Sequence, residues 1–212
     1  MEIMYSNKDY ELFKNKITCI YGDKVNLINL GYEFNGIIYD DEWTVKKFLN
    51  GHKFKLNYKV IELFNELGVK NSLLKKRIKY LSSGELKLIL LVYVLLNNKE
   101  VLIFDYFDKC LSNKLKKKVI NYLKTKYDGK LVFISNDLIF LNTLSNNIIV
   151  FKDNNIVFND EFIKLYKSKI KLNYPPIIKF IKLANKKQAK LSFTVDSKEL
   201  LKDIYRSVRW DI

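Results

Sequence analysis

Two short, wholly apolar runs separated by a lysine-rich segment constrain the fold of this chain more than any other feature. Val101–Phe104 reads VLIF and ends in Asp105, and Leu131–Ile134 reads LVFI. Between them, residues 113–126 have the pattern of a basic amphipathic helix. Uninterrupted apolar strands are typical of a parallel sheet that is covered on both faces, because neither face meets water. We therefore expect an α/β fold in which these runs are central strands.

The remaining chain predicts more strands and helices around this unit. Residues 44–80 have helical spacing, and a nearly all-apolar helix is expected from Glu85 to Leu96. Another helix is expected over residues 137–145. The expected shorter strands are Lys16–Tyr21, Gly36–Tyr39, Ile148–Phe151 and Ile156–Phe158, the last two joined by a turn at Asp153-Asn154-Asn155.

The tail of the chain differs in character. Pro175-Pro176 predicts a helix start, and Asp196 with Glu199 three residues later predicts a second, capped start. The expected buried face of the second helix consists of Leu200, Leu201, Ile204 and Tyr205. We expect an α/β main domain over residues 1–170, with a helical subdomain at about 44–98, and a small helical domain over residues 171–212.

Composition limits the location and the chemistry. The chain has 212 residues, and none of its apolar runs approaches the ~20 residues that a membrane-spanning helix needs. Its N-terminus does not resemble a secretory signal. Cys19 and Cys110 form no partner pattern, and His52 is the sole histidine. These features predict reduced thiols in the cytoplasm and no metal site.

The net charge of +15 leaves three interpretations open. In the first, the composition is simply rich in Lys, Asn and Ile, and the lysines spread along every helix form solvated faces. A cytoplasmic protein held against anionic lipid would also carry this sign of charge. Nucleic-acid binding is the interpretation that we favour least, because such surfaces more often combine Arg with aromatic residues.

One short motif indicates which protein family this chain resembles. Leu81-Ser82-Ser83-Gly84-Glu85 precedes the apolar helix, and alone it predicts only a helix entry. With the strand ending in Asp105 about twenty residues later, the order resembles the ABC ATPases, whose signature loop, usually LSGGQ, precedes a Walker B strand. In this resemblance the D-loop position is Asp108–Ser112. The Q-loop and switch-histidine positions are Asp40 and Asn136. The resemblance implies an ABC-type P-loop NTPase-like fold.

The tail narrows the resemblance to the ATPases of energy-coupling factor (ECF) importers. It includes Asn173-Tyr174-Pro175-Pro176 and Thr194–Leu201. These ATPases act as pairs beneath a membrane protein that carries a vitamin- or metal-binding component. The implied partners are therefore an intact ABC ATPase subunit, in a heterodimer, and a transmembrane coupling subunit. The implied location is the inner face of the cell membrane.

The phosphate-binding loop is reduced. A Walker A loop, GxxxxGK[ST], cradles phosphate oxygens with its backbone amides and reaches them with its lysine. Here Gly22 and Lys24 are remnants, without a second glycine or a magnesium-binding hydroxyl. We therefore expect this chain's own site to bind no cofactor.

Three further catalytic positions depart from the family. Tyr106 replaces the glutamate after the Walker B aspartate, and a phenol with a pKa of about 10 does not polarise water as a carboxylate does. Asn136 cannot take a proton, and Asp40 stands at the glutamine position. In the D-loop segment, Ser112 is the last residue. Since phosphoryl transfer depends on positioning and electrostatics, we expect no independent ATPase activity.

The signature segment keeps its donors at a helix start, where an anion is favoured. Two interpretations stay open. It completes the ATP and magnesium site of an intact partner, or it only caps a helix. The corresponding function is a catalytically degenerate ABC subunit of an ECF-like importer. The alternative is a non-transport regulatory or nucleic-acid-binding protein on a decayed ABC scaffold.

Overall fold

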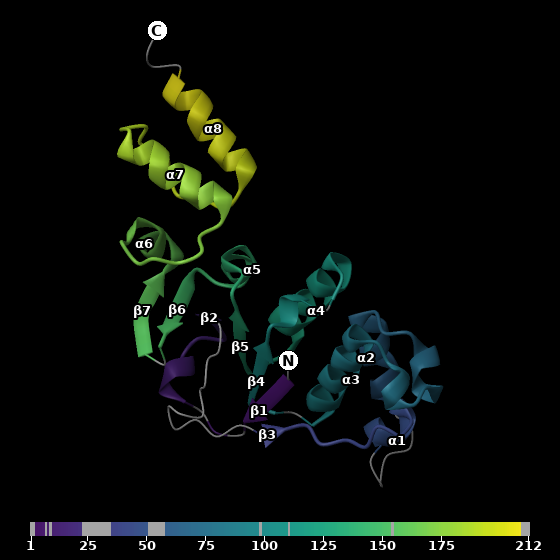
Figure 1. Cartoon of the computed structure of the whole chain (residues 1–212). Helices are drawn as coiled ribbons and strands as arrows, with labels where there is room; N and C mark the ends of the chain where they lie inside the picture. Colours follow the sequence, from purple (N-terminus) through teal and green to yellow (C-terminus); the bar gives the residue numbers. More distant parts are fainter. Residues whose placement is uncertain are drawn as a thin grey trace. The chain divides into compact units, whose positions relative to one another are not determined.

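The structure is a computed structural model of the chain (Figure 1). It describes residues 3–6, 8, 10–22, 35–50, 58–97, 99–109, 111–153 and 155–208. Lys24, His52, Cys110 and Asn154, which the sequence analysis singled out, lie outside these residues. Over the described part, no helix combines the length and the apolar character that crossing a bilayer requires.

The described chain divides into two compact units. The first comprises Met1–Thr18 and Asn26–Ile134, and the second comprises Cys19–Val25 and Ser135–Ile212. The domain boundary expected at residue 170 falls within the second unit and stays a prediction.

The first unit builds its sheet from four strands in the order β3-β1-β4-β5. Their bounds are β1 Ile3–Ser6, β3 Asn35–Gly36, β4 Val101–Asp105 and β5 Lys130–Ser135. β4 and β5 are parallel, with Phe104 opposite Phe133, and β1 is antiparallel to β4. The predicted central strands are therefore confirmed. Phe104 and Phe133 stack with ring centroids 4.8 Å apart, and both are buried.

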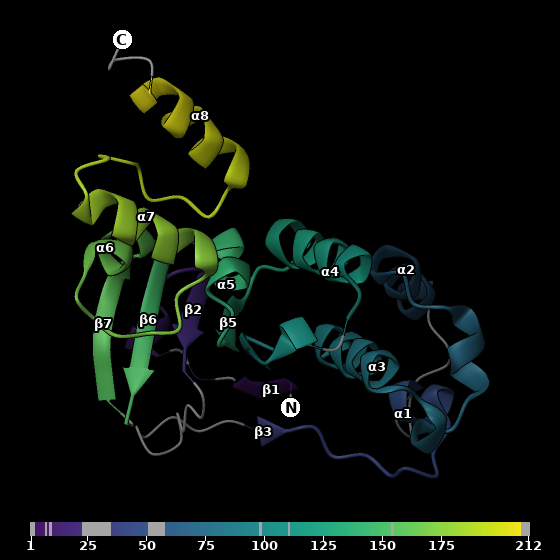
Figure 2. The ribbon, with the colours of Figure 1, turned by 45° about the horizontal axis from the view of Figure 1, so that its top comes forward.

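Helices α1 to α4 complete this unit (Figures 1 and 2). Their bounds are α1 Val45–Asn50, α2 Tyr58–Leu67, α3 Ser83–Leu96 and α4 Asn113–Lys126, and short 3-10 helices cover Glu11–Phe13, Asn71–Lys75, Ile78–Tyr80 and Phe107–Lys109. α2 packs on both α3 and α4, while α3 also contacts β1. The apolar composition of α3 follows from this position, because the side chains of five of its residues are buried: Ile89, Leu90, Leu91, Val92 and Val94.

The second unit contains three strands and four helices among its described residues. Their bounds are β2 Ile17–Tyr21 (whose Cys19–Tyr21 part belongs here), β6 Asn147–Lys152, β7 Asn155–Glu161, α5 Leu138–Leu144, α6 Phe162–Lys167, α7 Pro176–Lys186 and α8 Ser197–Val208. β2 pairs in parallel with β6, and β6 pairs with β7 as the predicted antiparallel hairpin.

Some expectations about apolar segments were wrong. The strand expected over Gly36–Tyr39 does not extend past Gly36, where β3 ends, and Ile38 is 92% exposed. On α8, Leu200 is buried, but Leu201 and Tyr205 are exposed. The periodicity correctly predicted an amphipathic helix there, but it does not determine how much of the apolar face is covered.

Candidate functional site

The signature-like segment forms the N-terminus of α3. Ser82 is the N-cap residue: its hydroxyl accepts a hydrogen bond from the Glu85 amide at 3.2 Å. In return, the Glu85 carboxylate accepts from the Ser82 amide at 2.8 Å. This reciprocal capping box fixes the first turn of the helix. The N-terminus of α3 is therefore positioned by its own sequence.

The capping box leaves donors beside it. Neither Ser83 nor Gly84 gives its amide to an acceptor among the described residues, and Ser83 is exposed. These amides occupy the first two positions of a 14-residue helix, where the helix dipole favours an anion. The arrangement offers two backbone donors and a hydroxyl to a negatively charged group.

Glu85 brings negative charge to this helix end, and its surroundings compensate it. The Ser82 amide, and to a lesser extent Lys76 at 3.3 Å, hold the pKa of Glu85 below its ordinary value. The carboxylate is therefore ionised at neutral pH and engaged on both sides. The negative charge that would repel an incoming anion is offset within the segment itself.

A buried lysine, missed in the sequence analysis, joins α3 to the end of β4. Lys87 is 5% exposed, and its Nζ donates to the main-chain oxygen of Tyr106 at 3.2 Å. Its ammonium also lies 5.7 Å from the ring centroid of Phe107. A lysine inside an apolar helix gives a sequence signal of its own, since lysine is rarely buried without a partner.

The position after Asp105 has unusual backbone geometry. Tyr106 has a φ of 48°, in the left-handed region, and its amide donates to Ile134 O at 2.9 Å. Its ring lies 4.2 Å from the ammonium of Lys109. Backbone strain of this kind occurs preferentially at functional positions. The side chain nevertheless presents a phenol rather than a carboxylate to the end of β4.

Asp40 lies in a turn rather than in a cavity. Its carboxylate accepts from the Glu42 amide at 2.9 Å, and its carbonyl accepts from Trp43 at 3.0 Å. The same segment is tied to the residues before the signature, because Glu42 forms ion pairs with Arg77 at 3.0 Å and with Lys79 at 2.6 Å. The Q-loop-like and signature-like segments are thereby held in one unit.

The other predicted positions are described separately. Ser112 is the N-cap of α4 and accepts from the Leu115 amide at 3.4 Å. Gly22 is buried directly after β2, and Asn136 directly follows β5; both belong to the second unit. The structure therefore places Leu81–Glu85, Asp105 and Tyr106 in the first unit, together with Asp40 and Ser112.

Among the described residues, no group of three or more His, Cys, Asp or Glu side chains could hold a metal ion. Magnesium bound beside a nucleotide uses a phosphate-loop hydroxyl in addition to the strand-end aspartate. Here the residue after Asp105 is a phenol, and Lys24 lies outside the described residues.

Comparison with known proteins identifies the class that this fold represents. Two solved structures share the fold: a dimeric bacterial ABC transporter cassette, MJ0796, and a putative metal-chelate type ABC transporter in an inward-facing conformation. The first has a TM-score of 0.52 and 16% identity, covering 75% of this chain and 98% of the other. The second has a TM-score of 0.52 and 12% identity, covering 76% and 82%. The predicted ABC-type α/β fold is confirmed.

A sequence relative agrees with this fold. The zinc import ATP-binding protein ZnuC of Ehrlichia chaffeensis is 29% identical over 138 residues, which cover 59% of this chain and 57% of that protein. The chain thus spans little more than half the length of this relative. No family model matches the sequence. The sequence is thus similar to an ATP-binding protein of an ABC transporter, and the fold is that of ABC transporter cassettes.

Proposed function

We propose that this chain is a catalytically degenerate ABC-type subunit of an ECF-like importer. It pairs with an intact ATPase subunit and lends its signature loop to the ATP site of that partner. It hydrolyses no ATP by itself. Its own site holds no nucleotide, while ATP and magnesium are shared at the partner's site. The heterodimer lies on the cytoplasmic face of the membrane.

The observation that carries the proposal is the preserved N-terminus of α3. Ser83 and Gly84 keep unused amides at a capped helix start, and the Ser83 side chain is exposed. A helix end of this kind binds phosphate groups without further machinery. In contrast, Tyr106 occupies the position of the water-orienting carboxylate. An intact donor end combined with a lost carboxylate fits a subunit that completes another chain's site.

Pairing is supported by the similarity to a cassette whose solved structure is dimeric. In ABC dimers the signature loop of one subunit faces the Walker A loop of the other. The reduced segment around Gly22 and Lys24 lacks the second glycine and the hydroxyl of a Walker A loop. A homodimer of this chain would therefore have no complete phosphate loop. The partner must supply it, which makes the functional pair a heterodimer.

Contact with a transmembrane coupling subunit is supported by an apolar feature next to α3. A cavity of about 340 Å³ in the first unit is lined by Ile37, Tyr39 and Leu86, among others. Ile38, between two of these residues, is 92% exposed. A fully exposed aliphatic side chain in this segment is available for contact with another protein.

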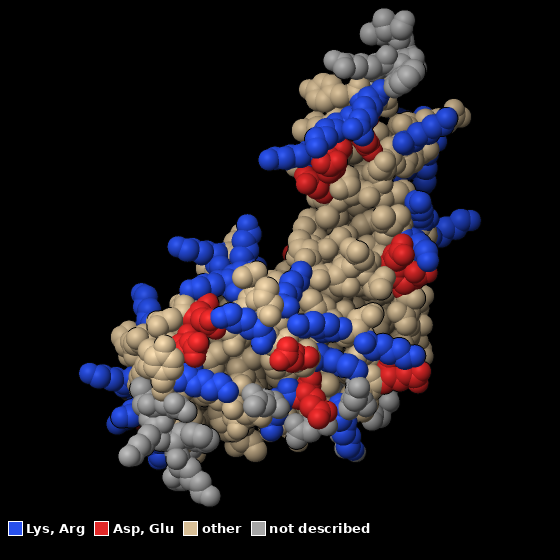
Figure 3. All heavy atoms as spheres, turned by 180° about the vertical axis from the view of Figure 1, so that it is seen from behind, with Lys and Arg blue, Asp and Glu red and all other residues tan. Residues whose placement is uncertain are grey.

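A regulatory or nucleic-acid-binding protein remains the alternative, favoured only by the net charge of +15. Figure 3 shows the basic side chains spread over the visible face among acidic and uncharged ones, rather than gathered into one stripe. Such a distribution fits solvated lysines better than a nucleic-acid track.

Affinity purification of the tagged chain from its native cells tests the two functions directly. We expect a second ABC subunit with a complete Walker A sequence, together with a membrane protein, to copurify in stable ratio. A matched purification with Ile38→Asp should lose the membrane protein and keep the ATPase. Recovery of the chain with nucleic acid alone, released by raising the salt concentration, would reject the proposal in favour of the alternative.

A further inference from the structure

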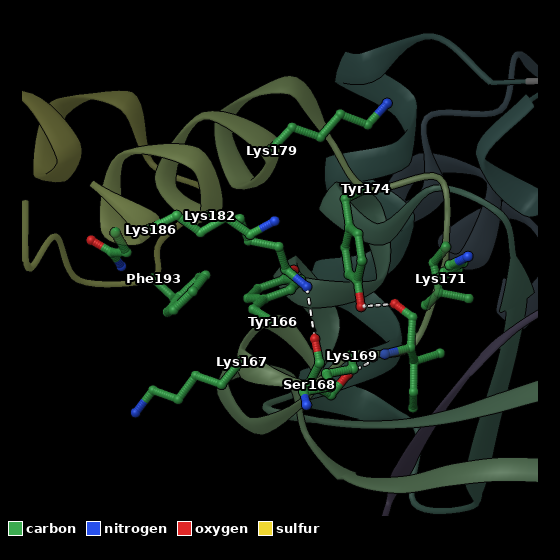
Figure 4. Close-up of a pocket in the computed structure, with 13 residues that line it drawn as sticks. Tyr166, Lys167, Ser168, Lys169, Lys171, Tyr174, Lys179, Lys182, Lys186 and Phe193 are labelled. Carbon is green, nitrogen blue, oxygen red and sulfur yellow. Dashed lines mark hydrogen bonds between the residues drawn. The ribbon is translucent and has the colours of Figure 1, made fainter. Parts of the chain in front are cut away.

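The second unit contains an open cavity that no part of the proposed ATP chemistry uses. Its volume is about 660 Å³, within the range of 300 to 1,000 Å³ typical of small-molecule sites. The walls are the end of α6, the segment after it as far as Tyr174, the helix α7, and Phe193 (Figure 4). All of these residues belong to one compact unit.

The lining is strongly and uniformly basic. No carboxylate is among the lining residues, and six of them are lysines: Lys167, Lys169, Lys171, Lys179, Lys182 and Lys186. Within the described chain, none of the six forms an ion pair with an acidic side chain. Two other lysines of this unit do have such partners: Lys164 pairs with Asp160 at 2.9 Å, and Lys202 pairs with Glu199 at 2.8 Å. The positive charge around the cavity is therefore not compensated by the protein.

Lys182 is held in place within this cluster. Its Nζ donates to the Ser168 carbonyl at 3.0 Å and lies 4.0 Å from the ring centroid of Tyr174 (Figure 4). The Tyr174 hydroxyl in turn donates to Ile170 O at 2.9 Å, which fixes the ring under the ammonium. A fixed cation loses less conformational entropy on binding a ligand than a freely moving lysine does.

The surroundings of Lys182 disfavour its charged form. Burial, and secondly the neighbouring Lys186, lower the pKa of Lys182 from its ordinary value. Both causes disfavour the charged ammonium, whereas the negative charge of a bound anion would favour it. Because six of the lining residues are lysines, an anion with several charges would gain more than one with a single charge. The half-buried ring of Phe193 adds an apolar wall.

We propose that this cavity is a binding site for a small molecule that carries two or more phosphate groups. Lysine binds phosphate as a point charge, and the volume exceeds what a single phosphate would fill. The ligand is either a soluble diphosphate compound or a lipid headgroup with two phosphates. The site uses no residue of the signature segment and requires no partner subunit, so it is independent of the proposed ATP-site role.

The test uses the full-length purified chain and two probes. Inorganic pyrophosphate is titrated by calorimetry at roughly physiological ionic strength, where nonspecific attraction between exposed charges is screened. In parallel, flotation with phosphatidylcholine vesicles is measured with and without cardiolipin, a lipid that carries two phosphates. We expect saturable binding of one of these probes, with one pyrophosphate per chain in the calorimetric arm.

Three variants make the result specific. Lys182→Gln removes the fixed cation, and the double variant Lys171→Gln/Lys186→Gln removes two cations that form no hydrogen bond to the protein among the described contacts. Lys182→Gln should weaken binding by about tenfold, which corresponds to one lost charge-assisted contact, and the double variant, which removes two cations, should weaken it by about 100-fold. The control Lys114→Gln/Lys117→Gln removes the same charge as the double variant from exposed positions on α4. It should leave the affinity unchanged.

Each outcome is decisive. Pyrophosphate binding that the cavity variants weaken supports a soluble ligand. Cardiolipin-dependent flotation that they weaken, without pyrophosphate binding, supports a lipid headgroup. If neither probe binds, or if the cavity and control variants weaken binding equally, the proposal is overturned. Circular dichroism of all variants verifies that they are folded, and the double variant decides the matter should Lys182→Gln unfold.

Discussion

The ammonium of Lys87 donates a hydrogen bond to the main-chain oxygen of Tyr106, 3.2 Å away. This contact joins α3, which begins with the signature-like segment, to the residue directly after β4. It is made to a backbone atom at a position with a left-handed φ of 48°. The end of the Walker B-like strand and the signature helix are therefore linked through one buried cation.

Removing that cation should destabilise the chain. In Lys87→Met the aliphatic stem is kept and the Tyr106 oxygen loses this donor, which we expect to lower the free energy of unfolding by about 1 to 3 kcal/mol. Urea unfolding followed by circular dichroism measures the change. Lys114→Met, at an exposed position of α4, is the control and should stay within about 0.5 kcal/mol of the wild type. Equal stability of the two variants would contradict a structural role for Lys87.

The capping box makes stability depend on acid pH. The pKa of Glu85 is lowered, chiefly by the Ser82 amide, so the unfolded state binds more protons as the pH falls below 4.5. The stabilising contribution of Glu85 is present above that pH and is lost as the pH falls through the folded-state pKa. Glu85→Gln should therefore flatten the fall in unfolding free energy at acid pH. The comparison of urea midpoints from pH 6 to pH 3 tests this, and parallel curves for wild type and variant would contradict it.

Two glycines provide a matched pair for packing. A Cβ on Gly129 would lie 2.5 Å from the Glu100 carbonyl oxygen, which also accepts from the Lys130 amide at 2.8 Å and cannot move freely. A Cβ on Gly36 would meet nothing within 4 Å. Gly129→Ala should cost about 1 to 3 kcal/mol of unfolding free energy, because the turn between α4 and β5 must shift.

Thermal unfolding measures the difference between the two glycine variants. Gly36→Ala should leave the midpoint nearly unchanged, since the added methyl group meets open space. A Gly129→Ala midpoint equal to that of Gly36→Ala would show that the 127–130 turn is less tightly packed than the structure indicates.

The parts of the fold that the sequence predicts are those with a strong local pattern. β4 and β5 are buried on both faces, and this leaves a continuous apolar run that can be recognised directly. The helix start was predicted at Glu85 and lies two residues earlier, at Ser83, because Ser82 and Glu85 form a capping box that the sequence analysis did not identify. The order of these elements was sufficient to predict the ABC-type fold.

Other features depend on contacts that no local pattern encodes. Lys87 stands out in an apolar helix, but its partner is a main-chain oxygen, which every residue type carries, so the sequence does not identify that partner. The lysines around the second unit's cavity come from α6, α7 and the segment between them. Because they are spread along the sequence, the sequence analysis interpreted them as a solvated surface. The exposed Leu201 and Tyr205 show the opposite case, in which the pattern gave the apolar face but not its exposure.

The central claim is that the N-terminus of α3 serves a partner's ATP site, and substitution of Ser83 tests it most directly. Ser83→Phe fills the space beside the unused amides, whereas Ser197→Phe places the same side chain at the exposed first residue of α8. In the purified complex with the intact ATPase, Ser83→Phe should lower ATP turnover about 100-fold, the scale of one lost transition-state donor. Ser197→Phe should retain turnover. Unchanged turnover in the Ser83→Phe complex would contradict the account and leave the segment as a helix cap alone.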